Sequence, residues 1–167
     1  MKLTIDDVRS RFIKHFNGET GTVYASPGRI NLIGEHTDYN GGFVFPGAVQ
    51  QGMIAEIKPN GTRKIRAYSI DLKDYDEFSL DDEKGPRASH FRYIFGVARE
   101  MMALGVPVEG FDTAFAGDVP LGAGMSSSAA LESCYAFAIN DLFGGDYVTE
   151  NVSFDITQGI ITYSNAA

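Results

Sequence analysis

The sequence predicts an α+β domain, and the order of its helical and strand-like segments is the main reason. One helix precedes a set of short strand-like runs, a second helix follows them, and a last strand leads into a third helix. The 167 residues suffice for one domain, which at this length buries roughly 70% of its chain surface. An apolar fraction of 44% and a charged fraction of 22% are ordinary for a globular protein.

Three helices are predicted from apolar residues at helical spacing. The first spans residues 4–17, where Thr4 can cap the start and Gly18 stops the helix. The second spans residues 90–104 and carries aromatic and methionine side chains on one face, which we expect to belong to the core. The third spans about residues 127–143 and follows a glycine-rich turn.

The expected strands are short and are separated by turn residues. Pro27-Gly28 should end the first strand, and Pro46 indicates an edge position or a bulge. Asn60-Gly61 is a strong hairpin signal, so the strands on either side of it should pair with each other. The predicted strands are residues 22–25, 43–49, 53–58, 63–70, 75–80 and 111–116, followed by a hairpin within residues 152–163.

Charge and cysteine content exclude several classes of partner. The net charge of −8 argues against a nucleic-acid partner, because binding nucleic acid requires a basic face. No run of the sequence approaches the ~18 apolar residues that a membrane helix needs, and Asp6 and Asp7 interrupt the place of a signal peptide's apolar core. Cys134 is the single cysteine, so no internal disulfide forms, and we expect it to be a buried structural thiol. We therefore expect a cytoplasmic protein with no membrane partner.

The stretch GDVPLGAGMSSSAALE, residues 117–132, indicates a phosphate-binding turn. Gly122 and Gly124 allow the backbone to approach a ligand closely, and the helix that follows presents unpaired N–H groups and a partial positive charge. The hydroxyls of Ser126, Ser127 and Ser128 can cap the helix, bind phosphate oxygens or hold Mg²⁺. The turn is neither a Walker A loop nor a complete dinucleotide fingerprint. From these residues alone, a plain Gly/Ser turn that caps a helix is an equally good interpretation.

A second stretch, residues 26–49, contains a polar loop with the sequence GEHTDYN. Glu35, His36 and Asp38 are the kinds of side chain that bind sugar hydroxyls, because carboxylates accept hydrogen bonds and imidazole can donate or accept them. The same residues also suit a solvated turn. A metal site is a weaker interpretation, since the loop offers no fixed ligand geometry.

Read together, GRINLIGEHTDYNGGFVFPGAV at residues 28–49 and GDVPLGAGMSSSAALE at residues 117–132 closely resemble the galactokinase family of the GHMP kinase superfamily. The first stretch resembles the galactokinase signature and the second the superfamily's phosphate loop. The resemblance runs from about residue 8 to residue 143 and implies a lobe with the ribosomal protein S5 domain 2-like fold. It also implies ATP-dependent phosphorylation of galactose at the anomeric hydroxyl, giving galactose 1-phosphate.

The resemblance implies a role for each matching residue. Arg29 is expected to stabilise the transferring charge, and Glu35, His36 and Asp38 to bind galactose. The ATP phosphates are expected to contact the residues that match the superfamily's loop, with Ser128 as a ligand of Mg²⁺. These residues are Gly122, Gly124, Ser126, Ser127 and Ser128.

The C-terminal part of the sequence departs from the family pattern. The resemblance implies a kinase N-terminal lobe at residues 1–143, with the galactose loop at 26–49 and the phosphate loop at 117–132. Residues 144–167 are expected to be an atypical tail. The chain lacks the family's GIMDQF-like element, whose aspartate is the candidate base, and the family's C-terminal lobe. We therefore expect the chain alone to be weakly active or inactive.

Two alternatives remain open from the sequence. The chain could be a non-catalytic galactose- and ATP-binding module, although its intact serine run at residues 126–128 favours an enzyme. It could also act on an N-acetylgalactosamine-like sugar, because kinases for that sugar share the Glu35, His36 and Asp38 group. Mevalonate and homoserine kinases have no need of this group. The sequence does not specify the oligomeric state or the adenine-binding residues.

Overall fold

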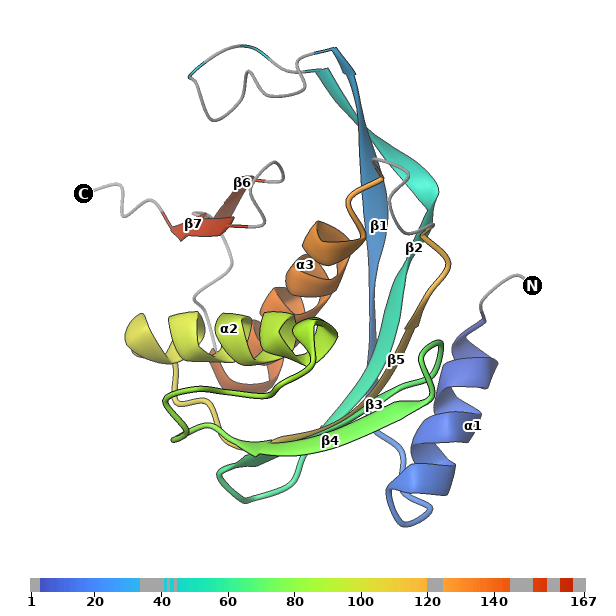
Figure 1. Ribbon diagram of the computed structural model, residues 1–167, viewed down its shortest axis with the longest axis vertical. Coiled ribbons are helices and arrows are strands. Elements are labelled where there is room, and N and C mark those ends of the chain that lie inside the picture. Colours follow the sequence, from blue (N-terminus) through green and yellow to red (C-terminus); the bar gives the residue numbers. More distant parts are fainter. Residues whose placement is uncertain are drawn as a thin grey trace.

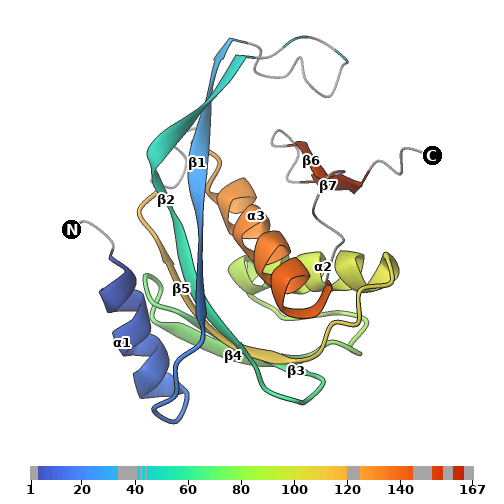
Figure 2. The same cartoon turned by 180° about the vertical axis from the view of Figure 1, so that it is seen from behind.

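The fold is seen in a computed structural model, in which helices cover both faces of one sheet (Figure 1). Helix α1 lies on one face, and α2 and α3 lie on the other, as the reverse view also shows (Figure 2). The helices are α1 (Ile5–His15), α2 (Ser89–Ala103) and α3 (Ser127–Ile139), and a π-helical turn, η2 (Asn140–Gly144), extends α3. The structure describes residues 4–33, 41, 43, 45–119, 125–144, 152–155 and 160–163.

The central sheet is mixed and has the strand order β1-β2-β5-β3-β4. Only β3 and β5 are parallel; the other neighbouring pairs are antiparallel. The strands are β1 (Thr22–Ile33), β2 (Phe45–Pro59), β3 (Lys64–Ser69), β4 (Asp74–Ser79) and β5 (Phe111–Gly117). Two further strands, β6 (Val152–Asp155) and β7 (Ile160–Tyr163), form a separate antiparallel pair, which confirms the predicted hairpin. The element order agrees with the predicted α+β class.

The prediction that Pro27-Gly28 ends the first strand is wrong. Strand β1 continues to Ile33 and pairs with β2 beyond the glycine, with Arg29 opposite Ala48. The register shifts between Pro27 and Arg29, so the strand absorbs the two residues as an irregularity. Because β1 is an edge strand, the missing N–H of a proline is tolerated there.

Strand β2 is one continuous strand where the sequence predicted two. The predicted runs 43–49 and 53–58 are joined through residues that pair with β1 on one side. Pro46 lies opposite Asn31, next to a second register shift, as the edge or bulge prediction required. The β1–β2 ribbon therefore extends well beyond the rest of the sheet (Figure 1).

The hairpin predicted at Asn60-Gly61 does not form, because β5 lies between β2 and β3. The turn docks instead against the residue that precedes β5: the N–H of Gly110 donates to the carbonyl oxygen of Thr62 at 2.7 Å. The Asn60 amide nitrogen donates to a carboxylate oxygen of Asp112 at 2.8 Å. The polar groups of the turn therefore form hydrogen bonds with residues that are distant in sequence. The Asn-Gly signal is local and could not reveal these partners.

Two apolar layers hold the helices on the sheet. On one face, Phe12 and Phe16 of α1 pack with Ala114 of β5, and the predicted cap at Thr4 is confirmed by a capping box with Asp7. On the other face, aromatic and aliphatic side chains of α2 and α3 pack on the sheet. The largest fully buried side chains of that layer are Tyr135, Phe91, Phe111, Ile57, Ile65, Leu80, Ile94, Met101 and Ile139.

A buried carboxylate joins α1 to the sheet. Glu56 of β2 is fully buried, accepts from Arg9 Nε at 3.2 Å and accepts from the N–H of Gly21 at 2.7 Å. A paired, hydrogen-bonded carboxylate in this position has a structural role. It fixes the approach of α1 and the start of β1.

Replacing Gly110 by alanine should lower the free energy of unfolding by about 2 kcal/mol. A Cβ there would lie 2.3 Å from the carbonyl oxygen of Lys64, which is a backbone atom that cannot move aside. The matched change Gly96→Ala in α2 meets nothing within 4 Å, so it should raise the free energy by about 0.5–1 kcal/mol. Urea denaturation of the 167-residue chain measures both; equal effects of the two changes would contradict this description of the β2–β3 connection.

Candidate functional site

The candidate site lies where strand β1 passes the start of helix α3. The backbone N–H of Arg29 donates to the carbonyl oxygen of Met125 at 3.1 Å. The Arg29 side chain donates through Nη2 to the Ser126 hydroxyl oxygen at 2.8 Å, across 97 residues of sequence. The two stretches that the sequence singled out therefore meet at this point.

The absence of a side chain at Gly28 makes this approach possible. A Cβ on Gly28 would lie 2.9 Å from the carbonyl oxygen of Met125 and 3.2 Å from that of Gln51. It would also lie 3.2 Å from a methyl group of Val119. The space next to Arg29 is therefore too narrow for any residue other than glycine without a shift of the backbone.

The start of α3 has an unusual geometry. Ser126 occupies the N-cap position with φ 54° and ψ 55°, which is the left-handed region, and its hydroxyl does not cap the helix. N-cap residues ordinarily adopt an extended conformation and bind the first turn through the side chain. Here that hydroxyl accepts from Arg29 instead.

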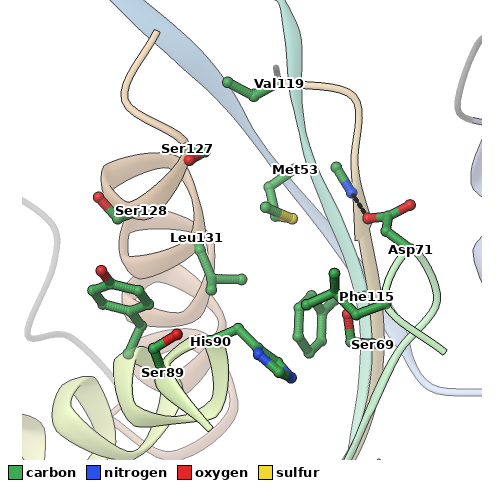
Figure 3. A pocket seen from close by; sticks show the side chains of 13 residues that line it. Met53, Ser69, Asp71, Ser89, His90, Phe115, Val119, Ser127, Ser128 and Leu131 are labelled. Atoms are coloured by element: carbon green, nitrogen blue, oxygen red, sulfur yellow. Dashed lines mark hydrogen bonds between the residues drawn. The ribbon is translucent and has the colours of Figure 1, made fainter. Parts of the chain in front are cut away.

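A cavity of about 460 Å³ adjoins the start of α3 (Figure 3). Ser127, Ser128 and Leu131 of α3 form one wall, and residues from α2, the β3–β4 turn and the sheet form the others. The remaining lining residues are Met53, Ser69, Asp71, Leu72, Ser89, His90, Tyr93, Phe115, Gly117 and Val119. A mostly apolar cavity with a few polar groups is typical of a small-molecule site.

Two carboxylates of the β3–β4 hairpin lie beside this cavity, and one of them ties the hairpin to β5. Asp71 accepts from the N–H of Gly117 at 2.7 Å, which ties the turn to the end of β5 (Figure 3). His90 lies with its Nε2 3.1 Å from a carboxylate oxygen of Asp74 and with its ring 4.1 Å from the ring of Phe91. These contacts orient polar groups toward the cavity without filling it.

A titratable group lies one turn beyond the serines. Glu132 of α3 is half-buried, and its Oε2 has no hydrogen-bond partner among the described residues. Burial raises the pKa of this carboxyl to about 7 from its ordinary value of 4.5. Burial therefore favours the protonated form of Glu132 more than in an exposed glutamate.

Cys134 is buried as the sequence predicted. Burial raises the pKa of its thiol to about 12, which disfavours the thiolate at neutral pH. This residue belongs to the core between α3 and the sheet and takes no part in the candidate site.

The predicted site residues divide into two groups. Arg29, Ser126, Ser127 and Ser128 are described, and the structure brings Arg29 to the start of α3. The other predicted site residues lie outside the described part of the chain. They are Glu35, His36 and Asp38 of the polar loop and Gly122 and Gly124 of the phosphate loop.

Sequence reasoning missed the far walls of the cavity. Ser69, Asp71, His90 and Tyr93 come from the β3–β4 hairpin and α2, and none belongs to a recognisable motif. His90 follows the helix start and faces Asp74, but this pairing depends on how α2 lies against β4. No local pattern could have identified these residues.

Comparison with known families covers both predicted stretches. The galactokinase galactose-binding signature matches residues 10–59, and the GHMP kinases N terminal domain matches residues 92–158. These two regions of the chain are therefore similar to a galactokinase and to the N-terminal domain of GHMP kinases, respectively.

Curated proteins similar to this chain include galactokinases. The galactokinase of Roseiflexus sp. (strain RS-1) is 43% identical over 141 residues, which is 84% of this chain and 36% of that protein. The galactokinase of Clostridium perfringens (strain 13 / Type A) is 39% identical over 145 residues, 84% of this chain and 38% of that protein. The chain thus spans somewhat more than a third of the length of these relatives.

Solved structures of GHMP kinases share the fold. Lactococcus lactis galactokinase, crystallised with galactose, has a TM-score of 0.70 and 36% identity, covering 80% of this chain and 36% of that one. Methanococcus jannaschii mevalonate kinase has a TM-score of 0.62 at 22% identity, covering 75% of this chain and 41% of that one, and it bears on the fold alone. The mixed sheet with its helices is therefore the GHMP kinase N-terminal architecture, as the resemblance implied.

None of the helices in the described ranges is long and apolar enough to cross a membrane.

Replacing Glu132 by glutamine should raise the free energy of unfolding by about 1 kcal/mol at pH 8. At pH 4 the same replacement should change that free energy little. The folded pKa of about 7 lies above the unfolded value of 4.5, so ionisation opposes folding and stability falls as pH rises between these values. Glutamine removes that charge. Urea denaturation at both pH values measures the difference, with Glu100→Gln on α2 as the control. An equal effect of Glu132→Gln at pH 4 and pH 8 would show that burial does not shift this carboxyl.

Proposed function

We propose that this chain provides the nucleotide- and sugar-binding lobe of a galactokinase, which transfers the γ-phosphoryl group of ATP to the anomeric hydroxyl of galactose. The product is galactose 1-phosphate. The contact between Arg29 and Ser126 supports this proposal, because it joins the segment of the galactose-binding signature to the phosphate loop. The likeness to a galactokinase crystallised with galactose supports the same sugar.

We assign the sugar to Glu35, His36 and Asp38. Their side chains can accept and donate several hydrogen bonds, which is the chemistry that distinguishes one set of ring hydroxyls from another. Arg29 lies on β1, the strand that precedes these residues in the sequence.

We assign the ATP phosphates to Gly122, Gly124 and the serines at 126–128, and the nucleoside to the adjoining cavity. The N-terminal end of α3 offers N–H groups and a partial positive charge to phosphate oxygens. The cavity begins at Ser127 and Ser128 and has apolar walls at Leu131, Phe115 and Met53, which suit the face of a base. In this proposal the phosphates and the base would lie next to each other.

The residues present fit a magnesium ion that arrives with ATP. Ser128 lines the cavity next to the proposed phosphate site, and a neutral hydroxyl suits Mg²⁺ as one oxygen ligand beside phosphate oxygens and water. Among the described residues there is no cluster of three acidic, histidine or cysteine side chains that could hold a metal by itself. Ser128 would be the protein ligand, and the ion would neutralise phosphate charge.

Phosphoryl transfer depends on position and charge more than on covalent chemistry. Two hydrogen bonds hold the Arg29 guanidinium and backbone against residues 125–126, so the cation needs little reorganisation to stabilise charge on the transferring group. The chain carries a net charge of −8, so this local positive group must offset an overall repulsion of ATP.

We place the lobe at residues 1–143, with the galactose loop at 26–49 and the phosphate loop at 117–132, and residues 144–167 as a distinct tail. We infer a cytoplasmic location from the single cysteine and from the cellular supply of ATP. The chain spans only 36% of the Roseiflexus relative, so we expect the 167-residue polypeptide alone to bind its ligands with little turnover. The loss of a general base alone would lower the rate by about 10²- to 10⁴-fold.

Titration calorimetry of the 167-residue chain should detect binding of MgATP and of galactose, and Ser128→Ala should weaken MgATP binding about tenfold. Ser133→Ala, a half-buried serine on the same helix, is the matched control and should leave binding unchanged. Glucose, which differs from galactose in one hydroxyl, should bind at least tenfold more weakly because a polar group of the site loses its partner.

A coupled ADP-release assay of the same chain completes the test. Ligand binding with weak turnover agrees with the proposal. Normal kinase rates would contradict the expectation about the isolated chain, and binding of both ligands with no turnover would indicate a binding module. If the chain binds neither MgATP nor galactose, the proposed function is overturned.

A further inference from the structure

The N-cap residue of α3 has a backbone conformation that costs free energy, and no capping hydrogen bond offsets that cost. Ser126 has φ 54°, a conformation that L residues rarely adopt and that glycine adopts freely. Its hydroxyl makes no helix-capping hydrogen bond, so the usual benefit of serine in this position is missing. Such strain persists only where the surrounding structure imposes it.

The surrounding group that imposes it is Arg29. The Ser126 hydroxyl accepts from Nη2 of Arg29 at 2.8 Å, and the carbonyl oxygen of the preceding Met125 accepts from the Arg29 backbone N–H at 3.1 Å. The same residue therefore holds two consecutive residues of the turn, one through the backbone and one through the side chain. The narrow space at Gly28 keeps β1 at this distance.

We propose that Arg29 is a positioning residue for the start of α3: it holds Ser126 in the left-handed conformation and withdraws the serine hydroxyl from the helix cap. The first turn of α3 then keeps its N–H groups directed toward a polyphosphate rather than toward its own cap. This role rests on the proposed nucleotide site and is additional to any direct effect of the guanidinium charge on the phosphates.

Glycine at position 126 separates positioning from charge. Because glycine adopts the left-handed region without a partner, Ser126→Gly should keep the turn in place even without the arginine. If Arg29 acts through Ser126, Arg29→Met should weaken MgATP binding about tenfold in the natural chain, but at most about twofold in the Ser126→Gly background. If Arg29 acts only by its charge, the loss should be equal in both backgrounds, and that result would overturn the proposal.

Calorimetry on the four chains of this cycle gives the affinities, and Arg11→Met, an exposed arginine on α1 across the sheet, controls for the loss of one positive charge. Carbon chemical shifts of Ser126 in the ligand-free chain report its backbone conformation directly. They should indicate a left-handed Ser126 in the natural chain and in Arg11→Met. In Arg29→Met they should indicate that Ser126 has left the left-handed region.

The two readouts keep the proposals distinguishable. If the natural chain binds no MgATP, the proposed function fails, and the chemical shifts still decide whether Arg29 holds Ser126. If Ser126 stays left-handed in Arg29→Met, the positioning role is refuted whatever the affinities are.

Loss of the folded state in Arg29→Met would be seen in the same spectra. Arg29→Lys, which can donate a hydrogen bond to the hydroxyl, then replaces that variant. Lysine should restore the Ser126 chemical shifts at least in part. If folded Arg29→Lys shows both the natural shifts and the natural MgATP affinity, the positioning role is supported. If the shifts are lost while the affinity stays natural, the role is refuted.

Discussion

The close passage of β1 past the turn before α3 is the constraint on which the site depends. It requires a glycine at position 28, because any Cβ there would meet the Met125 carbonyl oxygen at 2.9 Å. It lets Arg29 bind Met125 through its backbone N–H and Ser126 through its side chain. Without this passage, the strand that leads to the polar loop and the helix that follows the phosphate loop would have no common point.

The sheet makes the passage possible by its strand order. Strand β1 is an edge strand whose partner, β2, is held in turn by β5, so the ribbon is anchored at one end and extends beyond the sheet at the other. Helix α3 packs on β1 and β2 from the face opposite α1 (Figure 2). The ion pair of buried Glu56 with the partly exposed Arg9 fixes the anchored end, while Arg29 of β1 contacts the start of α3 and Gly117 at the end of β5 lines the adjoining cavity.

Local signals in the sequence predicted most elements but not their pairing. Thr4 predicted the start of α1 because a helix cap depends on residues that are close in sequence, and the structure adds Asp7 as its partner. The Asn60-Gly61 turn misled because β5, which is more than forty residues distant, pairs between the two flanking strands. At Pro27-Gly28 an edge strand tolerated residues that would have ended a central one.

The sequence indicated Arg29 and the serines 126–128 as candidates because they lie in contiguous motifs, and the structure brings Arg29 into contact with Ser126. The cavity walls at Asp71 and His90 were not indicated, since they depend on the packing of a hairpin and a helix that share no motif. The left-handed conformation of Ser126 was also hidden, because a serine before a helix ordinarily indicates an extended cap. In physical terms, the sequence carried the chemistry of the site, and the long-range contacts decided its geometry.

The most direct measurement is backbone hydrogen exchange of the 167-residue chain with and without MgATP. Exchange should slow at residues 127–130 and around Arg29 when the nucleotide is bound, with no change in α1 on the opposite face of the sheet. Protection confined to α1, or no change at residues 127–130 under conditions where MgATP is bound, would contradict the claim that these two segments form one nucleotide site.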